Sequence, residues 1–134
     1  MEPVNESDLE WTETERGETA FRRKRLAAAA VEAPTDRASE GGAEDLGCSL
    51  YELPPGKRSW PYHYHVANAE AFYVLAGEGQ LRAPDGKHRL ATGDYVACPT
   101  GQDGAHRIVN DTDEPLRYLV LSTLNETDVT VYQN

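Results

Sequence analysis

The chain has 134 residues, which is enough for one domain with a hydrophobic core and too few for two. Its 23 acidic and 13 basic residues give a formal charge of −10, without the surplus of lysine and arginine that nucleic-acid binding requires, so we expect no DNA or RNA partner. No apolar run approaches the roughly 20 residues that cross a bilayer, and the acidic N-terminus is unlike a secretory signal, which together predict a cytoplasmic protein without a membrane partner.

Residues 1–45 are predicted to form an acidic N-terminal extension. The first twenty carry seven acidic side chains and one arginine, and we expect most of them to be mobile apart from an anchor at Leu9 and Trp11. Phe21–Leu26 suits a charged edge strand, although Ala27–Ala30 suits a helix equally well, so the type of this segment stays open. The basic run inside it favours a solvated edge or a salt-bridging strip over a nucleic-acid patch. Residues 33–45 are predicted to form a flexible acidic loop.

From residue 46 onward, short strands alternate with tight turns rich in glycine and proline. The expected strands are Cys48–Leu53, Trp60–His65, Ala71–Leu75, Gln80–Ala83, Lys87–Leu90, Tyr95–Cys98, His106–Asn110 and Leu116–Leu124. Regular short strands without a convincing helix predict an all-β domain, a sandwich or a barrel, over residues 46–124, with residues 125–134 as a C-terminal tail.

Three of the four histidines fall where they could converge with a glutamate. His63 and His65 lie two apart on a predicted strand, so both imidazoles project from one face, about 7 Å apart along the backbone. Glu70 opens the returning strand and shares its face with Phe72 and Val74, where an unpaired charge would be costly and a metal cation would offset that cost. His106 opens another strand after a glycine-rich loop.

Each of these residues can also be explained without a metal. An isolated His-x-His pair is often surface decoration or a satisfied pair on a strand, and a single glutamate is more often a solvated charge. His88, between Lys87 and Arg89, is predicted to be exposed. Cys48 and Cys98 have no CxxC partner, which favours buried reduced thiols over a single disulfide.

Two glycine-punctuated motifs give these residues a specific context. The first consists of Gly56, six residues, His63-Tyr64-His65, four residues, Glu70, six residues and Gly77. The second consists of Gly93, five residues, Pro99-Thr100-Gly101, four residues, His106, three residues and Asn110. Over these 55 residues the chain resembles the cupin superfamily. It departs from the usual pattern by one extra residue after Gly56 and by four residues instead of two between Gly101 and His106.

The resemblance implies an antiparallel double-stranded β-barrel of jelly-roll type. It also implies one divalent transition-metal ion held by His63, His65, Glu70 and His106. A donor set this rich in nitrogen disfavours calcium and magnesium and suits zinc, iron, manganese, nickel or copper. The stretches at residues 47–56 and 115–119 resemble those of small, single-domain cupins of unassigned function.

The other face of the first-motif strand carries Trp60, Tyr62 and Tyr64, which are expected to point away from the metal. Outward aromatic side chains need cover, either from the N-terminal segment or from a second copy of the chain. Because many cupins are homodimers, the resemblance favours a homodimer.

Two functions from different classes follow, and whether the chain is catalytic stays open. The first is an enzyme acting on a small oxygen-rich metabolite, of dioxygenase, isomerase or decarboxylase type, with the ion as Lewis acid. The second is a non-catalytic module that binds a small ligand or senses a metal. For side chains at the barrel mouth the sequence offers only five loosely placed candidates: Tyr73, Tyr95, Gln102, Asp103 and Arg107.

Overall fold

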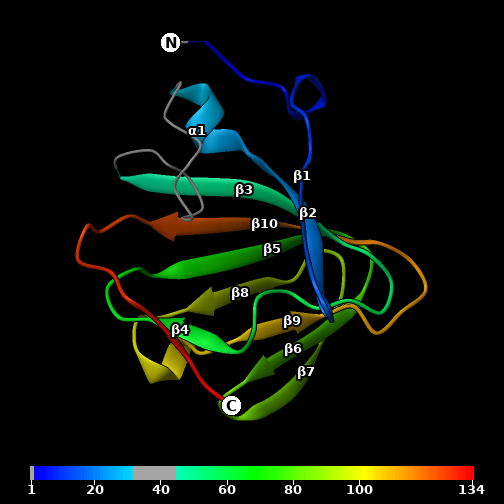
Figure 1. Cartoon of the computed structure of the whole chain (residues 1–134), viewed down its shortest axis with the longest axis vertical. Coiled ribbons are helices and arrows are strands. Elements are labelled where there is room, and N and C mark those ends of the chain that lie inside the picture. The colour runs from blue at the N-terminus through cyan, green and yellow to red at the C-terminus, as the bar shows by residue number, and fades with distance from the viewer. Residues whose placement is uncertain (1, 32–44) are drawn as a thin grey trace.

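Antiparallel strands form most of the regular structure in this computed structural model, which describes residues 2–31 and 45–134 (Figure 1). The strands are β1 (Thr12–Arg16), β2 (Thr19–Arg25), β3 (Leu46–Leu53), β4 (His63–His65), β5 (Glu70–Ala76), β6 (Gly79–Ala83), β7 (Gly86–Leu90), β8 (Tyr95–Cys98), β9 (Arg107–Val109), β10 (Leu116–Thr123) and β11 (Thr130–Tyr132). The helical elements are short, namely η1 (Glu6–Asp8), α1 (Leu26–Ala30) and η2 (Gln102–Gly104). The all-β prediction is confirmed.

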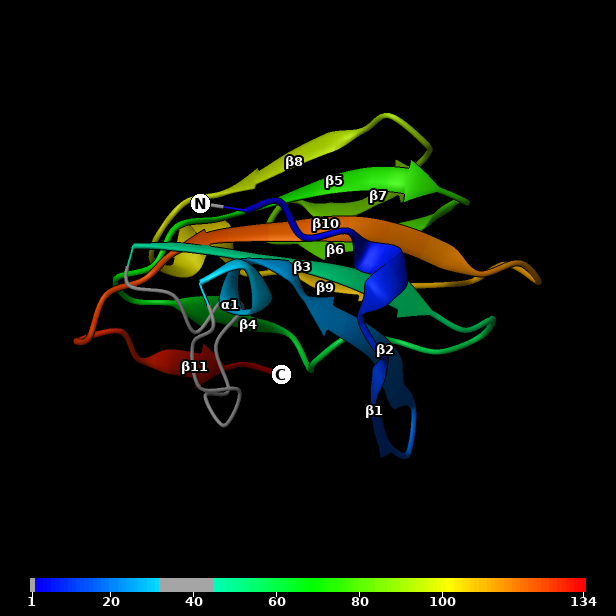
Figure 2. The same ribbon diagram turned by 90° about the horizontal axis from the view of Figure 1, so that it is seen from above.

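The strands assemble into three sheets that close around one interior. The largest has the order β1-β2-β3-β10-β5-β8, and the smaller ones are β7-β6-β9 and β11-β4. Every pairing between named strands is antiparallel. Seen from above in Figure 2, β8, β5, β10 and β3 lie on one side of the molecule, and β4 and β11 lie on the other. A β-bridge between His63 and His106 joins β4 to the residue just before β9. It connects the β11-β4 pair to the β7-β6-β9 sheet.

The core follows the two-residue period of the strands. In β5 the side chains of Glu70, Phe72 and Val74 are buried, as the alternation predicts, and in β10 those of Leu116, Tyr118 and Val120 are buried in the same way. Successive apolar side chains of several strands therefore point into one interior, where burial contributes about 25 cal/mol per Å² of apolar surface.

The N-terminal segment is more ordered than its charge suggests. β1 pairs with β2 and β2 pairs with β3, so β2 lies inside the large sheet and is not the predicted edge strand. Phe21 is only 2% exposed and belongs to the core, whereas Arg22 and Lys24 alternate with it and place their cations over the ring of Trp11. Trp11 makes contacts of the kind expected of an anchor, and the residues of β1, in a stretch expected to be mobile, form a strand paired with β2.

After residue 20 the chain forms first a strand and then a helix, the two alternatives that the sequence left open. Strand β2 ends at Arg25, and α1 follows directly. The alanine run has high helix propensity, and its methyl groups are too small to cover a sheet. The predicted flexible loop at 33–45 lies almost entirely outside the described residues. Among the residues that the structure describes, no helix is long and apolar enough to cross a membrane.

The strand predicted from Trp60 begins only at His63. Pro61 carries no backbone N–H, and residues 60–62 bend instead of pairing. Trp60 consequently turns inward and packs on Phe21, with 5.1 Å between the ring centroids, which corrects the expectation that it points away. Tyr62 is buried beneath the guanidinium of Arg82, 4.0 Å from its ring centroid. These two aromatic side chains are covered within the chain, so they no longer argue for a homodimer.

Candidate metal centre

A cavity of about 370 Å³ opens inside the barrel between the large sheet and the β11-β4 pair. One part of its wall is apolar and includes Trp60, Phe72, Ile108 and Val120. Three histidines and one glutamate line the same cavity: His63, His65, Glu70 and His106. An apolar wall excludes water and strengthens electrostatic interactions between these groups.

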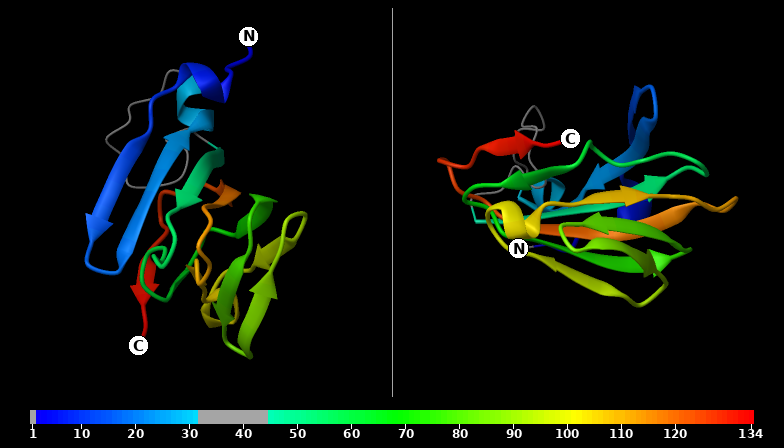
Figure 3. Two further views of the ribbon diagram at one scale, coloured as in Figure 1. Left: turned by 90° about the vertical axis from the view of Figure 1, so that its right-hand side faces the viewer. Right: turned by 90° about the horizontal axis from the view of Figure 1, so that it is seen from below.

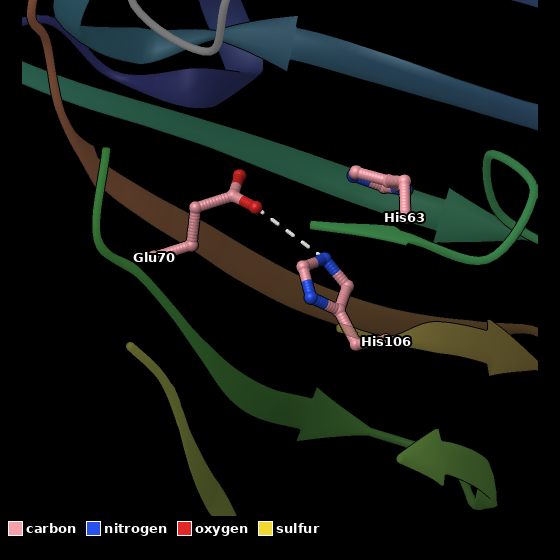
Figure 4. Close-up of side chains that lie close together, drawn as sticks. All are labelled: His63, Glu70 and His106. Atoms are coloured by element: carbon pink, nitrogen blue, oxygen red, sulfur yellow. Dashed lines mark ion pairs between the residues drawn. The ribbon is translucent and has the colours of Figure 1, made fainter. Parts of the chain in front are cut away.

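His63, Glu70 and His106 form a compact buried group. One nitrogen of each ring and one carboxylate oxygen all lie within 4.8 Å of one another. Figure 4 shows the three side chains on different segments, with the carboxylate of Glu70 directed at His106. The separation of the two histidines is set by the main chain, because His106 N donates to His63 O over 2.9 Å and His63 N donates to His106 O over 3.3 Å. Their ring centroids are 4.7 Å apart.

His65 reaches this group through Glu70. Its Nε2 lies 3.0 Å from Glu70 Oε1, and its ring centroid lies 5.2 Å from that of His63. It is not part of the set whose ligand atoms all lie within 4.8 Å of one another. The two histidines of the His-x-His pair do share one face and one cavity, but His65 occupies the flank of the group nearest to β11.

All three histidines are held by the same kind of contact. Nδ1 of His63 lies 2.7 Å from Pro61 O, Nδ1 of His106 lies 2.8 Å from Gly104 O, and Nδ1 of His65 lies 2.8 Å from a carboxylate oxygen of Asp128. These oxygens only accept hydrogen bonds, so each Nδ1 carries the proton and donates it. In a neutral ring Nε2 is then left as an acceptor, the form in which imidazole binds a metal.

The loop before His106 explains how its partner carbonyl is placed. A Cβ on Gly104 would lie 1.8 Å from Pro99 O, so only glycine fits where the chain packs this closely. The predicted glycine-rich loop therefore has a steric role. It delivers Gly104 O to the ring that follows two residues later.

Glu70 Oε1 is buried, and its nearest partners are His65 Nε2 at 3.0 Å and His106 Nε2 at 3.3 Å. Neutral rings would direct lone pairs at this oxygen, whereas a proton on Nε2 would be donated to it. Several lone pairs facing one another in a buried site repel, and leaving them uncompensated costs several kcal/mol. A cation bound between them removes this cost, so the donor set fits a transition-metal ion.

The charges within the group shift its pKa values strongly. Burial lowers the pKa of His63 to about 4, and the charge of His106 acts in the same direction. Burial also opposes the charge on His106, but its contacts with Cys98 and Glu70 outweigh burial and raise the pKa to about 10. The pKa of Glu70 lies well below its usual value, because His106 and His65 outweigh the opposing effect of burial. Despite burial, Glu70 and Asp128 raise the pKa of His65.

The five predicted mouth residues are not among the residues that line the cavity. Tyr73 lies on the outer face of β5, because Phe72 and Val74 beside it face inward, and Tyr95 is two-thirds exposed. Arg107 is buried but points elsewhere, toward Glu18 and Thr19. The five loosely placed candidates for the mouth are therefore not borne out by the lining of the cavity.

Four lining residues come from segments outside the predicted barrel: Arg16, Asp128, Thr130 and Tyr132. Arg16 ends β1, and the other three belong to the segment expected to be a C-terminal tail. Only the alternation of Thr130, Val131 and Tyr132 could have signalled a strand, and it carries no information about its partner.

The remaining predictions about single residues are met in part. His88 is exposed, as expected, and it also pairs with Asp85. Neither cysteine forms a disulfide. Cys98 is buried beside His106, whereas Cys48 is only partly buried.

Comparison with known proteins places this geometry in context. Residues 49–122 match the family described as "Cupin domain". A sugar phosphate isomerase of a cupin superfamily from Silicibacter pomeroyi is 26% identical with a TM-score of 0.82, over 99% of this chain and 82% of that one. A protein from Acidithiobacillus ferrooxidans named as a candidate sugar phosphate isomerase is 31% identical with a TM-score of 0.77, over 94% and 75%. No curated protein is significantly similar in sequence.

A more distant structure agrees in fold alone. The polyketide cyclase RemF from Streptomyces resistomycificus is 21% identical with a TM-score of 0.72, over 100% of this chain and 87% of that one. The jelly-roll barrel predicted from the two motifs is confirmed by these likenesses.

Proposed function

Because the chain belongs to the cupin domain family, we propose that it is a metal-dependent enzyme that isomerises a small phosphorylated sugar. The ion would be one of zinc, iron, manganese, nickel or copper, held by His63, His65, Glu70 and His106. When bound, such an ion acts as a Lewis acid toward a hydroxyl or carbonyl oxygen of the substrate.

One observation carries the proposal, namely the buried convergence of two imidazole Nε2 atoms on one oxygen of Glu70. These groups need a cation among them, because facing lone pairs in a buried site are destabilising, and a metal ion can take the place of the proton that the raised pKa of His106 keeps there. A site that is unfavourable without a cation and lies in a cavity of about 370 Å³ is suited to binding both an ion and a small molecule.

The residues around the group suit a polyhydroxylated molecule. The hydroxyl groups of Ser122 and Thr130 line the cavity, and a hydroxyl can both donate to and accept from a sugar hydroxyl. The rings of Trp60 and Tyr132 offer flat apolar faces on the same cavity. These residues would bind and orient the substrate and exclude water from the group.

The phosphate is inferred from Arg16. Among the described residues that line the cavity, Arg16 is the one cationic side chain besides the histidines. It forms no ion pair with any residue that the structure describes. Guanidinium groups bind phosphate through paired hydrogen bonds. Two similar proteins, at 26% and 31% identity, carry names of sugar phosphate isomerases, which supports the same substrate class.

The test of the proposal measures metal content and turnover together. Protein purified without a metal-affinity tag is expected to retain about one transition-metal ion per chain by elemental analysis. A panel of phosphorylated aldoses and ketoses, followed by NMR, is expected to contain one pair that the protein interconverts and that a chelator stops. Protein that holds the ion but converts none of them would support a non-catalytic binding module, and protein that holds no ion would contradict the proposal.

Arg16→Gln is expected to raise the KM for the phosphorylated substrate about 10- to 100-fold with little change in kcat. The reason is that a charge-assisted hydrogen bond contributes about 1.5–3 kcal/mol. Steady-state kinetics check this result, with Arg58→Gln as the matched control because Arg58 pairs with Glu18 and does not line the cavity. Equal losses with phosphorylated and unphosphorylated sugars would exclude a phosphate contact.

The alternative reactions and the remaining partners follow from this assignment. Oxygenation and decarboxylation of an oxygen-rich acid use the same kind of ion, and both stay alternatives that the substrate panel can include. A homodimer, a cytoplasmic location and the absence of nucleic-acid partners stay predictions from the sequence.

A further inference from the structure

We propose that Asp128 is a positioning residue that fixes the ring orientation and the tautomer of His65, and that the C-terminal segment thereby completes the metal centre. The inference rests on the proposed function, because it takes His65 to be a metal ligand. Asp128 lies beyond residues 49–122, which match the cupin domain, and it is not one of the four ligands that the two motifs predict.

The carboxylate of Asp128 is shared between the chain and the ring. Oδ1 accepts hydrogen bonds from Ala67 N over 2.8 Å and from Asn68 N over 2.9 Å. Oδ2 lies 2.8 Å from His65 Nδ1. The side chain is 12% exposed, and both of its oxygens face N–H groups, so the carboxylate acts here as an acceptor.

The backbone that follows Asp128 is held by strand pairing. Strand β11 pairs with β4, with Thr130 opposite His65, and Val66 N donates to Val129 O over 3.0 Å. Farther along, Gln133 N donates to Tyr62 O over 2.8 Å. Figure 3 shows the C-terminal strand running beside β4 in the view from below. The carboxylate is thus anchored between β4 and the turn that leads into Glu70.

The consequence for His65 is electrostatic as well as geometric. A carboxylate that accepts from Nδ1–H keeps the lone pair on Nε2, which lies 3.0 Å from Glu70 Oε1, and makes that nitrogen a stronger donor to a metal. Hydrogen-bond partners of this kind typically contribute 10- to 100-fold to metal affinity. Nδ1 of His63 and of His106 faces main-chain carbonyls, whereas Nδ1 of His65 faces two side chains, Asp128 at 2.8 Å and Thr130 at 3.4 Å. Asp128 is the shorter of these two contacts and can be altered by a substitution.

Asp128→Asn separates positioning from folding. The asparagine oxygen can still accept from Ala67 N and Asn68 N, which preserves the turn. Its amide group, facing His65, donates instead of accepting. The ring then takes the opposite tautomer, with the proton on Nε2, where it can donate to Glu70 Oε1. The substitution therefore places a proton on His65 Nε2 where the metal would need a lone pair, and so removes one metal ligand.

The experiment measures zinc affinity by chelator competition for the wild-type chain, Asp128→Asn, Glu70→Gln and a control, Asp111→Asn. Asp111 is an exposed carboxylate that pairs with Arg89, so the control makes the same chemical change away from the cavity. We expect Asp128→Asn to lose 10- to 100-fold in affinity with a nearly unchanged thermal midpoint, and Asp111→Asn to lose none. In ¹⁵N NMR of the zinc-loaded proteins, His65 should be protonated at Nδ1 in the wild type and at Nε2 in Asp128→Asn.

The outcomes distinguish the role of Asp128 from the existence of the metal centre. If Glu70→Gln loses zinc but Asp128→Asn keeps both wild-type affinity and the wild-type tautomer, the role of Asp128 is overturned and the metal centre stands. If the wild-type chain itself binds no zinc or other transition metal, the proposed function fails, and the inference fails with it.

Discussion

Glu70→Gln is expected to weaken zinc binding by about 10²- to 10³-fold. Removing one partner of a buried, charged set costs roughly 3–5 kcal/mol, and each 1.4 kcal/mol corresponds to about tenfold in affinity. Glutamine keeps the shape of the side chain but replaces a charged oxygen with an amide that can donate to the Nε2 atoms of His65 and His106. The variant therefore fills the centre with hydrogen bonds that compete with the ion.

Chelator competition measures the affinity, and circular dichroism shows whether the barrel still forms. Glu78→Gln is the matched control, since Glu78 is exposed at the turn that follows β5 and takes no part in lining the cavity. A Glu70→Gln protein that holds zinc as tightly as the wild type would show that the ion, if bound, sits elsewhere.

Zinc binding is expected to release a proton and to strengthen steeply with pH. In the metal-free protein the pKa of His106 is raised to about 10, so its ring is protonated at pH 6–8, and the ion requires the lone pair that this proton occupies. Apparent affinity should therefore rise about tenfold per pH unit for each proton displaced. The raised pKa of His65 adds a second proton toward the acidic end. His63, with a pKa of about 4, is already neutral and contributes none.

Isothermal titration calorimetry in buffers of different ionisation enthalpy counts the released protons. At pH 7.5 we expect at least one per zinc ion, and the count should be unchanged in His88→Ala, which removes an exposed histidine on β7. Affinity that stays flat between pH 6 and pH 8 would mean that His106 binds the ion without first losing a proton, and would contradict its place in the centre.

Local pattern was a good guide to the barrel and to where its inner face lies. The alternation of Glu70, Phe72 and Val74 follows from strand geometry, which acts between neighbours in the chain. The spacing of the two motifs was equally informative about His63 and His106, because each follows a turn and precedes or opens a strand. In the turn before His106, only glycine fits at Gly104.

The parts that sequence reasoning missed depend on pairing between distant segments. The contact between Asp128 and His65 spans 63 positions, and nothing near either residue indicates the other. The same holds for Arg16, which reaches the cavity only because β2 joins β3. The charge of the N-terminal segment also gave a wrong expectation of a solvated strip, because the cations of Arg22 and Lys24 lie over the ring of Trp11.

The reciprocal hydrogen bonds between the backbones of His63 and His106 have an energetic consequence. Two imidazoles on independent loops would have to be ordered by the ion itself, and that conformational entropy would subtract from its affinity. Here the chain has already paid it through strand pairing during folding. The converse should also hold. An ion bound by both imidazoles should stabilise the backbone pairing of His63 and His106 and slow amide hydrogen exchange at both residues.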